Sequence, residues 1–105
     1  MTTVEEFDRW LRQPEDRDIE FKKAEYTFSK DKDLPDYCAA LANEGGGKLI
    51  LGVNNNRQVV GTKAFEGTYN RLSNELLSKI GIRVDVDELM HPNGVFLCFM
   101  YLPVL

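Results

Sequence analysis

The stretch AALANEGGGKLILGVN, from Ala39 to Asn54, decides the fold of this chain. An apolar, helix-like run ends at Asn43, a run of glycines follows, and a second apolar run extends from Leu49 to Val53. A helix rarely continues through consecutive glycines, because each costs about 1 kcal/mol relative to alanine in a helix interior. The second run is therefore predicted to be a buried strand, joined to the helix by a tight glycine corner. Backbone N–H groups at such a corner can approach a ligand, so the corner is a candidate binding surface.

Length and composition indicate a single globular domain. The chain has 105 residues, of which 43% are hydrophobic and 29% charged. No apolar run approaches the roughly 20 residues that span a bilayer, and the acidic, amphipathic N-terminus is not a secretory signal. These features predict a cytoplasmic protein without a membrane partner. Cys38 and Cys98 each lie in an apolar run, which favours buried thiols over a disulfide or a metal site.

The charge distribution gives two opposing indications about nucleic acid. The net charge is −4 at pH 7, whereas proteins dedicated to binding nucleic acid are usually basic. Basic residues are nevertheless concentrated in two parts of the sequence, residues 17–32 and residues 48–63. A basic face on an acidic protein and a solvated surface of mixed charge are therefore both open.

Hydrophobic periodicity predicts the order of helices and strands. The expected helices are one capped by Thr3 and ended by Pro14, one from near Leu34 to Asn43, and one from Tyr69 to Ile80. The expected strands cover residues 19–22, 48–53, 59–61, 82–87 and 95–102, the second and third forming a hairpin around an asparagine turn. This order predicts an α+β fold with a mixed β-sheet and about three helices.

Several of these segments together resemble a known family. Glu15 precedes the strand IEFK (19–22), the corner ANEGGG (42–47) leads into ILGV (50–53), and the pair Val60-Gly61 comes next. In this order they resemble the Schlafen-type AlbA-like domain, from about Glu15 to Leu102. The resemblance implies a two-layer domain that binds nucleic acid, DNA in preference to RNA, in bacterial transcriptional regulators or divergent AAA-type ATPase proteins. Residues 1–105 are then expected to be one domain, the N-terminal part of a longer regulator.

The first functional hypothesis is a nucleic-acid-binding domain that is not catalytic alone. Its phosphate contacts would come from the glycine corner and from polar residues around it, with no cofactor and no metal. The candidate residues are Lys22, Asn43, Gly45, Gly46, Gly47, Lys48, Asn54 and Arg57. The corner lacks the G-x-x-x-x-G-K-[ST] pattern of a phosphate-binding loop, because Leu49 follows Lys48. Nucleotide hydrolysis therefore has no supporting motif.

The alternative is a metal-dependent nuclease that acts on RNA. In the animal Schlafen branch, as the resemblance implies, a cluster of carboxylates cleaves RNA. Glu15 and Glu20 match two of its glutamates, and Lys22 matches the basic residue beside them. Two carboxylates can hold Mg²⁺ or Mn²⁺. Asn54 stands where the third acid is expected, which weakens such a site, so catalysis by these residues belongs to this alternative alone.

A third hypothesis is an assembly module. The last apolar run would be a terminal strand whose edge pairs with a second copy of the chain to give a homodimer.

One aromatic loop also leaves a choice open. Tyr26 and Phe28, with Lys30 beside them, could stack nucleic-acid bases or pack onto the sheet.

Overall fold

The computed structural model describes residues 3–12, 19–28, 32–43, 45–65, 67–92 and 94–101. In chain order, its elements are α1 (Val4–Arg12), β1 (Ile19–Lys22), α2 (Asp33–Asn43), β2 (Gly47–Leu51), the short 3-10 helix η1 (Tyr69–Arg71), α3 (Leu72–Ile80), β3 (Val84–His91) and β4 (Gly94–Tyr101). Within these ranges, no helix has the length and hydropathy that crossing a membrane requires.

The four strands form one mixed sheet in the order β1-β2-β4-β3. β1 and β2 run parallel, with Glu20 opposite Leu49, and α2 lies between them in the chain. β4 is antiparallel to both of its neighbours, so Cys98 lies opposite Ile50 of β2 and Asp87 of β3. The predicted α+β fold with a mixed sheet is confirmed.

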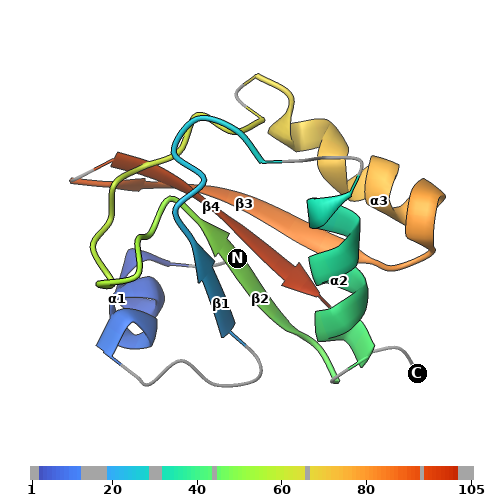
Figure 1. Ribbon diagram of the computed structural model, residues 1–105, viewed down its shortest axis with the longest axis horizontal. Helices are drawn as coiled ribbons and strands as arrows, with labels where there is room; N and C mark the ends of the chain where they lie inside the picture. Colours follow the sequence, from blue (N-terminus) through green and yellow to red (C-terminus); the bar gives the residue numbers. More distant parts are fainter. Residues whose placement is uncertain are drawn as a thin grey trace.

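Helices cover both faces of the sheet (Figure 1). α2 and α3 pack on one face, in a core cluster that contains Leu41, Leu49 and Phe99. α1 packs on the opposite face, where Phe7 is fully buried in a cluster with Ile50. We call these the α2/α3 face and the α1 face. Side chains alternate along each strand, so neighbouring residues such as Leu49 and Ile50 enter different clusters. α1 thus adds a third layer to the two that were expected.

Local signals account for the helix ends. The Glu6 N–H donates a hydrogen bond of 3.1 Å to Thr3 Oγ1, which confirms Thr3 as the N-cap of α1. α3 ends at Ile80 and is capped by Gly81, which has a positive φ of 69° and donates its N–H to the Leu77 carbonyl. The predicted burial of the two thiols is also confirmed, since Cys38 and Cys98 are both buried.

The predicted strand over residues 59–61 is wrong. The return segment makes a single bridge, between Val53 and Val59, and then leaves the strand. Gly52 has a positive φ of 105°, and its carbonyl accepts the N–H groups of both Val60 and Gly61. The chain then crosses to the β3–β4 hairpin, where the Thr62 N–H donates to the Val95 carbonyl at 2.7 Å. Pairing with β4 therefore replaces the expected hairpin ladder.

β4 is an interior strand, and this corrects the proposed route to a homodimer. Among the described strands, β1 and β3 form the edges, and both sides of β4 are already paired within the chain. Pairing of this strand with a second copy would require β2 or β3 to leave. Its continuous apolar run is explained by burial on both faces, because interior strands lack the alternation of half-exposed ones. Sequence alone does not distinguish an interior strand from an exposed edge strand that could pair with another chain.

Candidate nucleic-acid interface

Two of the predicted basic residues meet on the α1 face, at the C-terminal end of α1. Lys48 is the second residue of β2, and its Nζ lies 4.9 Å from the centre of the Trp10 ring. The Arg57 guanidinium donates hydrogen bonds of 3.5 and 3.3 Å to the carbonyls of Trp10 and Leu11. Trp10 therefore connects the two cations. Arg12, the exposed last residue of α1, adds a third positive charge at this end of the helix.

Arg57 has a structural task in addition to its charge. The last carbonyls of a helix have no partner within the helix and carry partial negative charge, which a nearby cation stabilises. The guanidinium carbon also lies 4.6 Å from the centre of the Phe21 ring. Arg57 adopts a positive φ of 63° in the turn that follows β2. Its contacts hold the 54–60 loop, α1 and β1 together.

Lys22 and Glu20 lie on the other face. They alternate with the buried Ile19 and Phe21 of the α1 face, so both point to the α2 side. The Lys22 Nζ is 3.5 Å from the Glu20 carboxylate and 5.1 Å from the centre of the Tyr37 ring. A hydrogen bond with Tyr37 and, more weakly, the charge of Glu20 raise the pKa of Lys22 above its usual 10.5. The sheet thus separates Lys22 from Lys48 and Arg57.

The glycine corner forms a helix C-cap. Gly46 donates its N–H to the Leu41 carbonyl at 3.0 Å, and Gly45 donates to the Ala42 carbonyl at 3.2 Å. This pair of bonds, with positive φ values of 96° and 104° at Gly45 and Gly46, is a Schellman motif. The amides expected to face a phosphate are therefore engaged by α2. Gly47 opens β2, and the last residue of α2, Asn43, is exposed.

Asn54 organises the turn that follows β2. Its Oδ1 accepts the N–H groups of Asn56 and Gln58 at 3.0 and 2.9 Å, and its Nδ2 donates to the Gln58 side chain at 3.1 Å. Asn is suited to this Asx-type turn because its short side chain mimics a backbone carbonyl. The structure thus gives Asn54 a local role, at the turn where the nuclease alternative expects an acid.

Glu15 lies outside the described residues, so the pairing of the Glu15 and Glu20 carboxylates stays a prediction. Over the ranges that the structure describes, His, Cys, Asp and Glu side chains form no group of three that could hold a metal ion. In the aromatic loop, Phe28 packs beside Tyr37 with ring centres 6.1 Å apart, whereas Tyr26 is 68% exposed. Lys30 lies outside the described residues.

Sequence reasoning missed the aromatic rings that position the cations. Trp10 and Phe7 fall on one apolar stripe of α1, a spacing that is typical of core residues. Phe7 is indeed buried, but Trp10 is only half-buried and lies against Lys48. The sequence feature that bears on the position of Lys48 is the strand alternation, which places Lys48 on the same face as Ile50. It does not reveal which helix covers that face.

Comparisons with known proteins bear on the family and the fold of this chain. A family model described as Schlafen, AlbA_2 matches residues 15–101. The chain belongs to the Schlafen AlbA_2 family. The matched segment holds the sheet, α2 and α3, while α1 precedes it. A comparison with curated proteins gives no significant match.

Two solved structures resemble this Schlafen AlbA_2 domain. The DIP2311 protein from Corynebacterium diphtheriae superposes with a TM-score of 0.66 at 18% identity, over 93% of this chain and 25% of that one. The second is the N-terminal domain of a Nitrosomonas europaea protein described as related to the ATP-dependent DNA helicase RecG. It gives a TM-score of 0.55 at 22% identity, over 92% of this chain and 69% of that one. The chain thus spans only about a quarter of DIP2311, and at these identities the likeness concerns the fold.

Proposed function

We propose that this domain binds nucleic acid through backbone phosphates, DNA in preference to RNA, as a non-catalytic module of a transcriptional regulator. The meeting of Lys48 and Arg57 at the end of α1 is the observation that carries the proposal. Membership of the Schlafen AlbA_2 family and the DNA helicase named for one structural neighbour support it.

The charge arrangement favours the α1 face over the α2 side of β1. Lys22 has the Glu20 carboxylate 3.5 Å away, which offsets its charge toward a phosphate. Lys48 instead lies over the Trp10 ring, which holds an ammonium group without neutralising it. A cation in this setting can donate to a phosphate oxygen while its stem stays ordered. Because such contacts ignore base identity, they give affinity and position rather than sequence preference.

The test is a salt titration of labelled duplex DNA, single-stranded DNA and RNA. Replacing one phosphate-contacting cation should reduce the slope of log affinity against log salt by about 0.9 for duplex and about 0.7 for single strands. Lys48→Gln is the informative variant, because Arg57 also supports the fold. Arg83→Gln is the matched control, an exposed cation just before β3. Lys22→Gln measures the opposite face.

A reduced slope with Lys48→Gln, and unchanged slopes with Arg83→Gln and Lys22→Gln, would support the α1 face. Affinity that does not change with salt, or a slope unaffected by Lys48→Gln, would overturn it. If Lys22→Gln alone reduced the slope, the interface would instead lie on the α2 side of β1.

Glu20 and Lys22 support a second proposal, a metal-dependent endoribonuclease. They are adjacent on one face of an edge strand, and both side chains are about one third exposed, at 35% and 37%. A carboxylate that binds Mg²⁺ or Mn²⁺ beside a cation that binds the scissile phosphate is the arrangement such a reaction uses. Strand cleavage that requires added metal, and that Glu20→Gln abolishes, would favour this proposal over simple binding.

A further inference from the structure

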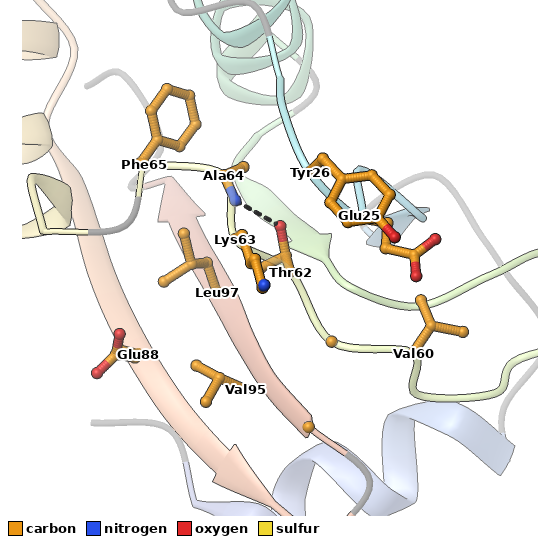
Figure 2. Close-up of a pocket in the computed structure, with 12 residues that line it drawn as sticks. Glu25, Tyr26, Val60, Thr62, Lys63, Ala64, Phe65, Glu88, Val95 and Leu97 are labelled. Carbon is orange, nitrogen blue, oxygen red and sulfur yellow. Dashed lines mark hydrogen bonds between the residues drawn. The ribbon is translucent and has the colours of Figure 1, made fainter.

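A pocket of about 450 Å³ lies on the α2/α3 face, near the turn that joins β3 to β4 (Figure 2). Its floor is formed by Val95 and Leu97 of β4, and the crossing segment 60–65 forms one wall. Glu88 of β3 shares the face of Leu97, its partner across the hairpin. The size and the largely apolar floor are those of a small-molecule site.

Backbone contacts fix the shape of this pocket. The Lys63 N–H donates to the Glu25 carbonyl at 2.8 Å, and the Thr62 hydroxyl donates to the Ala24 carbonyl. Gly61 crosses directly against Gly94, and a Cβ built on Gly94 would lie 2.9 Å from the Gly61 Cα. Only glycine permits this approach. The crossing segment is thus tied to both the hairpin and the chain after β1, so the pocket is preformed.

The polar groups of the pocket are few and chemically distinct. Figure 2 shows the carboxylates of Glu25 and Glu88 on opposite sides, with Lys63 between them. A carboxylate only accepts hydrogen bonds and an ammonium only donates them. Glu25 is already paired with Lys23 at 3.6 Å, whereas Glu88 has no ion pair with any described residue. Tyr26, 68% exposed, offers the face of its ring at the rim.

We propose that this pocket binds a guanine base. Guanine presents adjacent N1–H and N2–H donors on one edge, which a single carboxylate accepts in a bidentate manner, and we assign that role to Glu88. Its O6 and N7 acceptors match Lys63, as they match lysine in DNA recognition. The ring would lie over the apolar floor and beside Tyr26, which supplies stacking.

The other bases match the pocket less well. Adenine and cytosine place a ring-nitrogen acceptor next to their amino group, so it would face the Glu88 carboxylate. Uracil places its one ring donor between two carbonyl acceptors. This complementarity, rather than the pocket's volume, selects guanine.

The inference goes beyond the proposed function and does not rest on it. Lys48 and Arg57 lie on the α1 face, whereas the pocket lies on the α2/α3 face. The guanine could belong to a free nucleotide or to an unpaired position in a strand, and both present the same edges.

The experiment is a titration of the ¹⁵N-labelled chain, followed by amide chemical shifts. Guanosine monophosphate should shift the amides of Gly61, Thr62, Lys63 and Gly94. The adenosine, cytidine and uridine monophosphates should shift them far less at equal concentration. A parallel arm uses a uridine oligonucleotide with one central guanosine, against the same strand with a central adenosine.

A guanine-specific response in either arm supports the proposal and identifies the source of the base. Equal responses to guanine and adenine, or no pocket shifts in both arms, would overturn it. These outcomes are independent of the Lys48 salt titration, because free guanosine monophosphate reports on the pocket alone.

Two variants examine the assigned contacts. Glu88→Gln should weaken guanosine monophosphate binding roughly fivefold or more, since the bidentate acceptor is lost. Glu5→Gln is the matched control, the same change at an exposed position on α1. Tyr26→Ser removes the exposed ring and should also weaken binding. Glu88→Gln that binds as the parent does, with a folded amide spectrum, would contradict the assigned contact.

Discussion

Arg57→Met should loosen α1 from the sheet. The substitution removes the guanidinium that donates to the Trp10 and Leu11 carbonyls at 3.5 and 3.3 Å. It also removes the cation 4.6 Å from the centre of the Phe21 ring, while the methionine retains an apolar stem. We therefore expect lower stability without loss of the fold.

The magnitude follows from these contacts. A cation at a helix C-terminus contributes about 0.3–1 kcal/mol at a surface and more when partly buried. A cation–π contact adds about 0.5–1 kcal/mol. The hydrogen bonds are long and overlap with the charge contribution, so the total is about 1–2 kcal/mol. For a domain of about 100 residues, each 1 kcal/mol lowers Tm by roughly 4–8 °C, so the expected decrease is about 4–16 °C.

Thermal unfolding by circular dichroism measures the stability, and tryptophan emission reports on α1. Trp10 is the single tryptophan of the chain and lies on α1, so its emission should shift to longer wavelength as the helix loosens. Arg83→Met is the matched control, because Arg83 is exposed. Arg57→Met with the parent's Tm and emission would refute the role of Arg57 as a clamp on α1.

Three further changes have definite expected outcomes. Gly94→Ala should cost about 1–3 kcal/mol in urea unfolding, because the new Cβ meets backbone at 2.9 Å and the φ of +149° disfavours side chains; full stability would show that the crossing is not tight. The raised pKa of Lys22 predicts that its stabilising effect is present below 10.5 and is lost as pH rises through the folded-state pKa. The stability difference between the parent and Lys22→Met should therefore shrink as the pH rises above 10.5, and a constant difference would contradict the Tyr37 contact. Asn54→Asp keeps the acceptor for the Asn56 and Gln58 amides, so the chain should fold; under the nuclease proposal it should increase Mn²⁺-dependent RNA cleavage, and an inert variant would count against that proposal.

Local sequence signals predicted most of the secondary structure correctly. Thr3, Gly81 and the glycine corner act within a few residues of the ends they define, so their effect is visible in the sequence. The start of α2 is shifted only slightly, since Asp33 opens the helix and Pro35 still lies in its first turn. β3 begins at Val84 rather than Ile82 and continues to His91, because pairing with β4 extends the strand.

Local sequence signals do not determine the order of the strands in the sheet. The apolar run 95–102 looks the same whether it forms an edge or the interior of a sheet, and only partners distant in the sequence decide between them. The separation of Lys22 from Lys48, on opposite faces of the sheet, was unpredictable for the same reason. Alternation placed Lys22 and Lys48 on faces of their own strands, but which faces coincide depends on the β1–β2 register, where Ile19 pairs with Lys48.

The interior position of β4 has a consequence for synthesis of the chain. β2 gains an antiparallel partner only when residues 94–101 have emerged from the ribosome, since β4 follows every other described strand. Until then β2 keeps one unpaired edge, and the apolar side chains of Leu49 and Leu51 lack their cover from β4. Closing the sheet also joins segments far apart in the chain, which slows folding. Nascent chains that stall before Gly94 should therefore be substrates for chaperones, whereas release of β4 should convert them to a protease-resistant domain in a single step.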